Sequence, residues 1–353
     1  MKPKSTFRGL SIVLALLIAT GLSPISTFAT EPDPDAGQSR PRSALDTMWT
    51  SGWVDLATSE SRTLTHNMGG DIEDYAIQMW FRDTDTGGYG INNRAYGGDE
   101  DNGVWLGAFW RSLDNTTISV ARQLADVMAD QVRVWIWPSE ADDEYCTPDW
   151  TAISQNETAT VTHNLGGNVD RYAVKLWFRT DSLNGVHQIY YGGAEGGGKA
   201  YGAYWHGLDA SQVQVSRIID DTEVEEFYLC VSVPEPPDWD SGWTPLDPGQ
   251  AVVLNHNLGG NINRYIVRME FKAVSTKGSP ELPMAIHHNA YGGASTNVLG
   301  KDAAYLGANW QNLTDQSITL YRWSDDQLAD QIRVRIWLRR MSIYLPVVFR
   351  NSL

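Results

Sequence analysis

The segment Leu64-Thr-His-Asn-Met-Gly-Gly70 decides the fold, because it occurs three times in related form. The second copy reads Val161-Thr-His-Asn-Leu-Gly-Gly167, and the third reads Leu254-Asn-His-Asn-Leu-Gly-Gly260. The copies are offset by 97 and 93 residues, which is the size of a small domain. The sequence therefore predicts three tandem repeats.

Further residues recur at constant distances from this segment. Each copy has a tryptophan 13 residues before the histidine, and later an arginine followed four residues on by an aspartate. These residues are Trp53, Trp150 and Trp243, then Arg122, Arg217 and Arg322, then Asp126, Asp221 and Asp326. We assign the repeats to residues 48–140, 145–234 and 238–340.

Apolar residues alternate with other residues inside each repeat. In the first copy Tyr75, Ile77, Met79 and Phe81 occupy every second position. A period of two is typical of a strand with one buried face, and the glycine-containing segments between such runs predict turns. The expected fold class is all-β, with three antiparallel β-sandwich repeats that can be arranged with pseudo-threefold symmetry.

The two cysteines occupy positions that align between repeats. The position of Cys146 holds Trp49 and Trp239 in the other copies, and that of Cys230 holds Trp135 and Arg335. A disulfide, an aromatic contact and a cation–π pair would each join facing positions. We expect the first and last strands of each repeat to be neighbours and Cys146 to bond with Cys230; the alternative is two unpaired buried thiols.

The ends of the chain have different compositions from the repeats. Basic residues, an apolar run from Leu10 to Ala19 and small residues up to Ala29 are typical of a signal peptide over residues 1–29. A flexible acidic leader is expected over 30–47 and a C-terminal tail over 341–353. The apolar run is shorter than the roughly 20 residues of a membrane span, so we expect a protein that is secreted, extracellular or at the cell surface.

The charge of the chain limits its partners. Its 353 residues include 27 Lys+Arg and 43 Asp+Glu, for a formal net charge of −16, and loss of the signal peptide takes this to −19. Nucleic acid favours a basic surface, so a nucleic-acid partner is not expected.

His66, His163 and His256 are the first candidate binding residues. Each lies beside a glycine-rich turn, where it either contacts a ligand or satisfies the backbone of the turn. A third interpretation has the three imidazoles converging on a metal ion, although nothing in their spacing requires this. The sequence predicts no metal site and no cofactor.

The three Arg/Asp pairs are the second candidate set. Arg122 shares the phase of inward residues such as Ile118 and Val120, so its charge requires a partner. One interpretation is a structural clamp to Asp126; the other is a sugar site, because Arg supplies donors and Asp supplies acceptors for hydroxyl groups.

The tryptophans divide into two groups by strand phase. Trp110, Trp205 and Trp310 are expected in the core, whereas Trp53, Trp135 and Trp137 face the other way. Trp53 and Trp137 are candidates for a ligand-stacking surface, or else they pack between repeats. The acidic segment 99–102 is expected to be a solvated loop, since the other copies lack it.

The order of strands in each copy resembles the H-type lectin domain. The resemblance spans most of each repeat and depends on strand patterning, as in Ser317–Asp325 and Asp330–Trp337. It implies six-stranded antiparallel β-sandwiches, trimeric assembly and binding of N-acetylgalactosamine-type sugars. Three linked copies would resemble such a trimer within one chain, so a monomer with an internal pseudo-trimer is expected.

The expected function is carbohydrate or cell-surface glycan binding without catalysis. The sequence has no His-Glu-x-x-His, no Gly-x-Ser-x-Gly in the mature chain and no phosphate-binding glycine loop. A polar set that recurs three times suits multivalent binding better than a single active site. The alternatives are a structural or adhesive surface protein without a small-molecule site and a secreted hydrolase.

Overall fold

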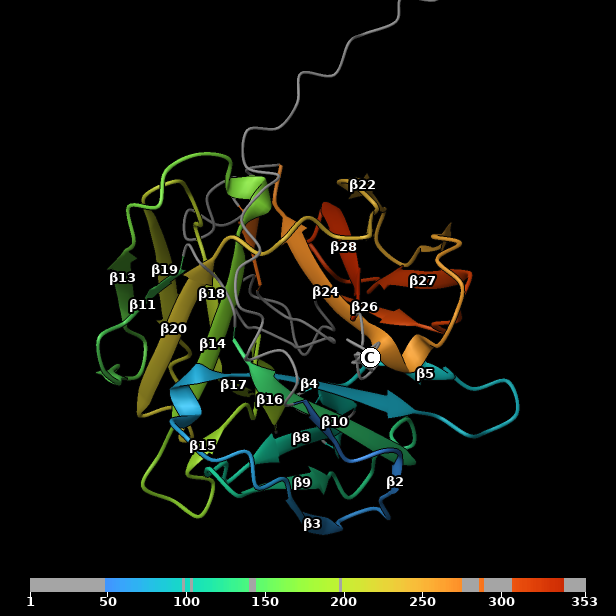
Figure 1. Cartoon of the computed structure of the whole chain (residues 1–353), viewed down its shortest axis with the longest axis horizontal. Coiled ribbons are helices and arrows are strands. Elements are labelled where there is room, and N and C mark those ends of the chain that lie inside the picture. The colour runs from blue at the N-terminus through green and yellow to red at the C-terminus, as the bar shows by residue number, and fades with distance from the viewer. Residues whose placement is uncertain are drawn as a thin grey trace, which may run out of the picture. The chain divides into compact units, whose positions relative to one another are not determined.

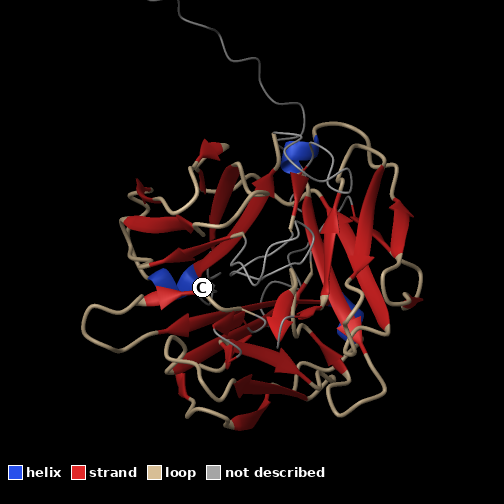
Figure 2. Cartoon of the chain, turned by 180° about the vertical axis from the view of Figure 1, so that it is seen from behind, coloured by secondary structure: helices blue, strands red, loops and turns tan. Residues whose placement is uncertain are grey.

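The computed structural model describes residues 48–96, 99–101, 104–139, 144–196, 199–274, 286–288 and 307–339. The predicted signal peptide, leader and C-terminal tail lie outside these residues. All described residues belong to one compact unit, and strands joined by turns make up most of it (Figure 2). Within the described ranges, no helix has the length and apolar character to cross a membrane.

Repeat 1 consists of two antiparallel sheets and a short hairpin. The five-stranded sheet contains β1 (Trp49–Thr50), β2 (Val54–Asp55), β10 (Gln131–Pro138), β4 (Tyr75–Arg82) and β5 (Ile91–Asn92). The three-stranded sheet contains β3 (Ser61–Thr65), β9 (Thr117–Arg122) and β8 (Ala108–Arg111). The hairpin consists of β6 (Asp99–Asp101) and β7 (Val104–Leu106), and the single 3-10 turn is η1 (Ile72–Asp74).

Repeat 2 has the same topology. Its large sheet contains β11 (Glu144–Cys146), β12 (Thr151–Ala152), β20 (Glu226–Ser232), β14 (Ala173–Arg179) and β15 (Val186–His187). Its small sheet contains β13 (Thr158–Thr162), β19 (Gln212–Arg217) and β18 (Ala203–His206). The hairpin is β16 (Ala194–Gly196) with β17 (Lys199–Tyr201), and the 3-10 turn is η2 (Val169–Arg171).

Repeat 3 follows the same order. Its large sheet contains β21 (Trp239–Asp240), β22 (Thr244–Pro245), β28 (Gln331–Leu338), β24 (Tyr265–Lys272) and β25 (Ile286–His287). Its small sheet contains β23 (Ala251–Asn255), β27 (Ser317–Arg322) and β26 (Ala308–Gln311), and its 3-10 turn is η3 (Ile262–Arg264). The three sets of strands follow one another in colour along the chain in Figure 1. The predicted fold class, three antiparallel β-sandwich repeats, is confirmed.

Strand alternation accounts for the core. On β10 the alternate residues Val132, Val134 and Ile136 are all fully buried, as their spacing predicts. Most buried apolar residues of the three repeats form one continuous hydrophobic cluster, and Phe109, Ala121 and Ile189 form a small second one. One expectation is wrong: Asp99–Asp101 is not a loop but strand β6, which pairs antiparallel with Val104–Leu106 of β7.

The strands that begin and end each repeat are neighbours in the large sheet, as predicted: β1 with β10, β11 with β20, and β21 with β28. Cys146 lies directly opposite Cys230 and the two form a disulfide. The facing pairs predicted for the other repeats are shifted by one residue, since Trp49 lies opposite Ile136 and Trp239 lies opposite Ile336.

A bulge causes this difference in register. In repeat 1, β1 and β2 both pair with β10, and the segment between them is one residue longer than the part of β10 that it faces. The extra residue lies at a Ser-Gly pair, where Gly52 has a φ of 65°. In repeat 2 the equivalent segment contains Pro148 and carries two extra residues, which aligns Cys146 with Cys230. The turn between the first two strands thus selects which residues face each other.

Loss of the disulfide should destabilise the protein without changing its fold. The bond closes a loop between residues 84 apart in the sequence, and such cross-links stabilise typically by about 2–4 kcal/mol through the unfolded chain. We expect a Cys146→Ala/Cys230→Ala variant to lose that free energy of unfolding in denaturant titrations. An unchanged denaturation midpoint would contradict the prediction.

Equivalent backbone contacts join the repeats in a cycle. Leu113 N donates to Val186 O at 3.1 Å, which joins repeat 1 to repeat 2. Leu208 N donates to Ile286 O, which joins repeat 2 to repeat 3, and Leu313 N donates to Ile91 O, which joins repeat 3 back to repeat 1. A chain whose repeats contact in this cyclic order has the connectivity of a closed trimer.

Side chains on the large sheets make a second set of equivalent contacts. Each side chain donates to the backbone carbonyl of a tyrosine in the previous repeat of the cycle. That tyrosine lies at the start of β4 or β24, or directly before β14. The donor–acceptor pairs are Lys175 with Tyr75 at 3.3 Å, Arg335 with Tyr172 at 2.7 Å, and Gln78 with Tyr265 at 3.2 Å. The three interfaces therefore share one design with different donors.

A third set of contacts is complete at two of the three interfaces. Trp150 Nε1 donates to Glu73 at 2.9 Å, and Trp243 Nε1 donates to Asp170 at 3.0 Å. The equivalent pair at the third interface is Trp53 with Asn263. Both Trp53 Nε1 and Asn263 Oδ1 are buried without a hydrogen-bond partner, so this interface lacks a bond that the other two possess.

Replacing Asn263 with Asp should therefore stabilise the chain. The carboxylate restores the acidic acceptor that Glu73 and Asp170 supply to the equivalent tryptophans. We expect a gain of about 1 kcal/mol in the free energy of unfolding, measured by thermal and chemical denaturation. A variant Trp53→Phe should abolish the gain; a gain that persists there would place the carboxylate in a different contact.

Candidate functional site

The candidate pairs Arg122/Asp126, Arg217/Asp221 and Arg322/Asp326 are internal clamps. Arg122 donates from Nε to Asp126 at 2.8 Å and from Nη1 to the carbonyl of Leu56 at 2.8 Å. Arg217 and Arg322 make the same two contacts with their own aspartates and with Ile153 and Leu246. Each clamp thus holds the turn after one strand against the start of the repeat.

The aspartates of these clamps are buried and fully engaged. Asp126 is 1% exposed and accepts hydrogen bonds from the backbone N–H groups of Gly107, Met128 and Ala129. Asp221 and Asp326 accept from the equivalent groups, and burial raises the pKa of both carboxyls. Between the two interpretations of these pairs, this geometry favours the clamp.

The three candidate histidines belong to turns. His66, His163 and His256 are each 6% exposed, and each Nδ1 accepts the backbone N–H two residues later, at 3.1, 3.3 and 3.2 Å. Burial lowers the pKa of His163 and His256, which favours the neutral ring that this acceptor role requires. Each ring also packs edge-on against a tyrosine of its own repeat.

The predicted core tryptophans are buried, and so is Trp135 of the second predicted group. Trp110, Trp205 and Trp310 are at most 1% exposed and belong to the core, as expected. Trp135 is also buried and contacts Trp80 with ring centroids 4.5 Å apart. Trp53 lies 4.1 Å from the Arg82 guanidinium, and the half-buried Trp137 lies 5.2 Å from that of Arg339.

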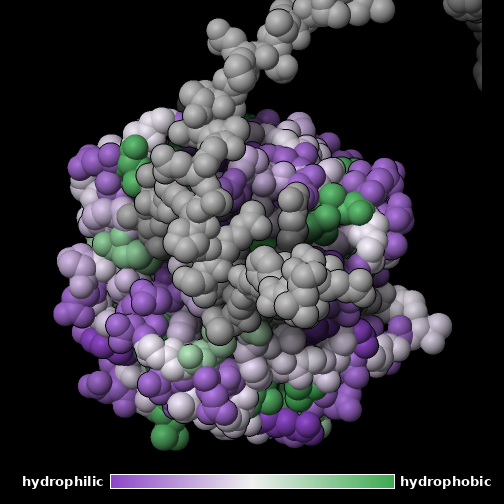
Figure 3. All heavy atoms as spheres, viewed as in Figure 1, coloured by the Kyte–Doolittle hydropathy of each residue, from purple (hydrophilic) through white to green (hydrophobic). Residues whose placement is uncertain are grey.

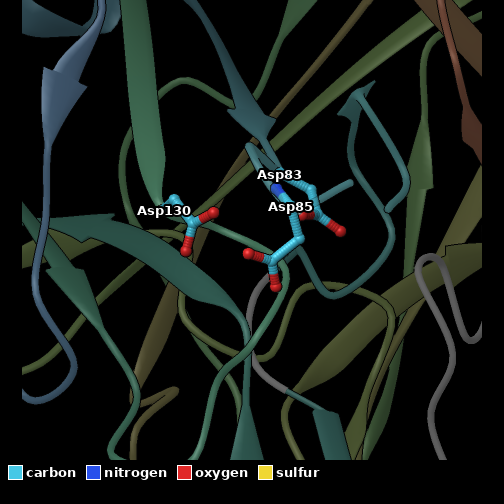
Figure 4. A group of neighbouring side chains, drawn as sticks. All are labelled: Asp83, Asp85 and Asp130. Atoms are coloured by element: carbon cyan, nitrogen blue, oxygen red, sulfur yellow. Dashed lines mark hydrogen bonds between the residues drawn. The ribbon is translucent and has the colours of Figure 1, made fainter. Parts of the chain in front are cut away.

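Three carboxylates in repeat 1 lie close enough to one another to hold a cation. Ligand atoms of Asp83, Asp85 and Asp130 all fall within 4.8 Å of one another (Figure 4). Asp83 already accepts from the backbone of Asp85 and Tyr89, and Asp130 accepts from Thr84 and Arg122. These bonds explain the cluster as a support for the loop after β4. The candidate histidines are not part of it.

A central cavity of about 160 Å³ lies where the three repeats meet. Strands β4, β14 and β24 each contribute five consecutive lining residues: 76–80, 173–177 and 266–270. Of the eleven candidate ligand-binding residues, Trp137 is on the described lining of this cavity and the others are not. A cavity of about 150 Å³ accepts one benzene ring, so this space suits one six-membered ring.

The polar residues of the central cavity occupy equivalent positions but differ between repeats. One position holds Gln78, Lys175 and Arg268; the next on the same strand face holds Trp80, Trp177 and Glu270; and a third, after the edge strand, holds Asn93, Gln188 and His288. The first set is partly exposed, whereas the second is at most 6% exposed. Repeat 3 therefore supplies Arg268 and Glu270, repeat 2 supplies Lys175, and repeats 1 and 2 supply most of the aromatic rings.

The buried end of the cavity is electrostatically organised. Glu270 accepts a hydrogen bond from Arg335, which is itself 1% exposed, while burial raises the pKa of Glu270. Burial also lowers the pKa of His288 to about 3, so its ring is neutral at pH 7. That ring packs 4.7 Å from the Tyr191 ring, whose hydroxyl accepts from Trp205 Nε1 at 2.9 Å.

The described residues on the face drawn in Figure 3 form no large apolar patch. The face in Figure 3 is mostly hydrophilic, with small separate hydrophobic spots. The exposed large apolar residues among those described number six and come from all three repeats: Leu124, Val127, Leu183, Ile219, Val253 and Val274. Isolated apolar residues of this kind are normal on a protein surface.

Comparison with known proteins gave no matching family model, no matching curated protein and no matching solved structure. The resemblance to H-type lectins is thus carried by the strand pattern alone. Sequence reasoning overlooked Lys175, Arg268, Glu270 and His288, because it searched for residues that recur. These residues could have been found by searching for the reverse pattern, namely positions on one strand face at which the three similar copies differ in charge.

Proposed function

We propose that this chain is an exported, non-enzymatic binding protein that holds one small carbohydrate in the central cavity. The observation that carries the proposal is the lining itself, in which aromatic rings and hydrogen-bonding side chains from all three repeats surround a space of about 160 Å³. Small-molecule sites are typically concave, largely apolar and equipped with a few oriented polar groups.

Sugar chemistry fits this lining better than a purely apolar ligand does. A pyranose ring has apolar C–H faces and a rim of hydroxyl groups, which need an aromatic surface and both donors and acceptors. Trp137 supplies a half-buried aromatic surface, while Gln78, Lys175 and Ser232 supply polar groups from two repeats. These side chains already bond to backbone groups around the cavity, and a sugar hydroxyl, unlike an apolar ligand, can add to those bonds.

An adhesive or structural role without a small-molecule site is the second candidate. It is favoured by the burial of the recurring Arg/Asp and histidine sets, each of which makes contacts within its own repeat. Such a protein would retain its stability contacts but bind no sugar. The secreted or surface location is part of both proposals and agrees with the Cys146–Cys230 disulfide.

Titration calorimetry and tryptophan fluorescence with a panel of neutral and acidic monosaccharides test the proposal. We expect saturable binding of one sugar per chain, weakened about tenfold or more by Trp137→Ser, which copies the equivalent Ser232. The matched control is Trp337→Ser, because Trp337 occupies the same position in repeat 3 but is not among the described lining residues. No binding at millimolar sugar by folded protein would favour the structural role.

A further inference from the structure

The charges of the central cavity are unlike those of the whole chain. Lys175, Arg268 and Glu270 line it, and Arg335 lies directly behind Glu270 as its hydrogen-bond partner. This group contains three cations and one carboxylate, in a chain whose formal net charge is −16. A local excess of positive charge at a concave site selects for an anionic ligand.

At physiological ionic strength, the charges that line the cavity determine whether it prefers an anionic ligand. The Debye length is about 8 Å at 0.15 M salt, so most of the acidic outer surface is screened from a ligand within the cavity. Lys175 and Arg268 are screened less because they are partly buried and line the cavity directly. The negative field of the chain therefore slows the approach of an anion more than it weakens the bound state.

The two cations are placed on adjacent walls of the same cavity. Lys175 is on β14 of repeat 2 and Arg268 is on β24 of repeat 3, at equivalent strand positions. Repeat 1 has Gln78 at this position, and its amide bridges Tyr265 O and Val267 N. A guanidinium pairs with the two oxygens of a carboxylate in a bidentate manner, and an ammonium adds a point charge.

We infer that the central cavity selects a monosaccharide that carries a carboxylate, such as a uronate, with Arg268 and Lys175 as the groups that recognise the acid. This inference depends on the proposed carbohydrate function, and it names the class of sugar. The ring of the sugar lies toward Trp137, while its carboxylate lies toward the β14 and β24 walls.

The test compares matched sugars that differ only in the acid group. Calorimetry at 0.15 M salt is carried out with glucose against glucuronate and with galactose against galacturonate. We expect the uronate of at least one pair to bind at least tenfold more tightly than its neutral partner. Uronate binding no tighter than neutral binding would overturn the inference and leave the proposed function standing, whereas absence of binding by all four sugars would overturn both.

Variants borrowed from the other repeats make the test specific. Arg268→Gln and Lys175→Gln copy Gln78 and should each lower the uronate-to-neutral affinity ratio at least fivefold, while Gln78→Lys copies Lys175 and should raise it. Lys272→Gln removes one positive charge outside the described lining and should leave the ratio unchanged. A gain of uronate affinity in Gln78→Lys cannot arise from misfolding, and an equal ratio in all four variants would overturn the inference.

Discussion

Replacing Arg122 with alanine is expected to lower the free energy of unfolding by about 3–5 kcal/mol, because it leaves the carboxylate of Asp126 buried without its charge partner. Asp126 is 1% exposed, and Arg122 also bonds to Leu56 and Asp130. Arg217→Ala and Arg322→Ala should have effects of the same size, since their contacts are equivalent. Chemical denaturation of the three single variants measures the losses.

The matched control for this prediction is Arg62→Ala. Arg62 also pairs with a carboxylate, that of Glu60, but its side chain is 45% exposed, so the loss should be several times smaller than for Arg122. An Arg122→Ala variant that folds with nearly full stability, yet loses ligand binding, would contradict the clamp and show that Arg122 binds the ligand. A large loss of stability in all three variants supports the clamp.

Lowering the pH from 7 to 4 is expected to destabilise the protein strongly through buried histidines. Burial lowers the pKa of His187 and of His287 to about 4, from an ordinary value near 6.5. Each Nε2 donates to a backbone carbonyl, at 2.8 Å for His187 and 3.1 Å for His287, which the charged ring can also do, so burial is what favours the neutral ring. His206 and His288 are lowered in the same direction.

The sign follows from proton binding by the two states. The unfolded chain protonates these rings below about pH 6.5, whereas the folded chain resists until about pH 4, so stability is complete above pH 6.5 and is lost as the pH falls. A pKa difference of this size corresponds to about 3 kcal/mol for each histidine. Unfolding free energies measured between pH 7 and pH 4 should therefore fall steeply.

Asparagine variants isolate the histidine contribution. Repeat 1 has Asn92 at the equivalent position, and its amide donates to Met128 O as the histidines donate to Glu223 O and Leu328 O. A His187→Asn/His287→Asn variant should lose less stability than the parent over the same pH range. A parent protein whose stability is flat from pH 6.5 to pH 4 would contradict the assignment of neutral buried rings.

Repetition made most of the fold predictable from the sequence. Constant spacing around the His-Asn-x-Gly-Gly segment gave the number of repeats, and alternation on segments such as 75–81 gave the strands. Aligning Cys146 with Cys230 predicted both the adjacency of the first and last strands and the disulfide. Each of these inferences uses information that the three copies share.

The same reliance on repetition explains what was missed. The one-residue shift at Gly52 depends on local backbone conformation, which the aligned residues Trp49 and Trp135 do not encode. The recurring polar sets proved to be buried supports, because a group that stabilises one repeat is needed in every repeat. The central cavity is formed once, between the repeats, so the residues at equivalent positions around it are free to differ.

The most direct measurement is a crystal structure of the protein with the most tightly binding monosaccharide. We predict one sugar ring within the central cavity, in contact with Trp137 and with polar groups on β4, β14 or β24. A sugar bound elsewhere on the protein, with the central cavity filled only by water, would contradict the proposed site.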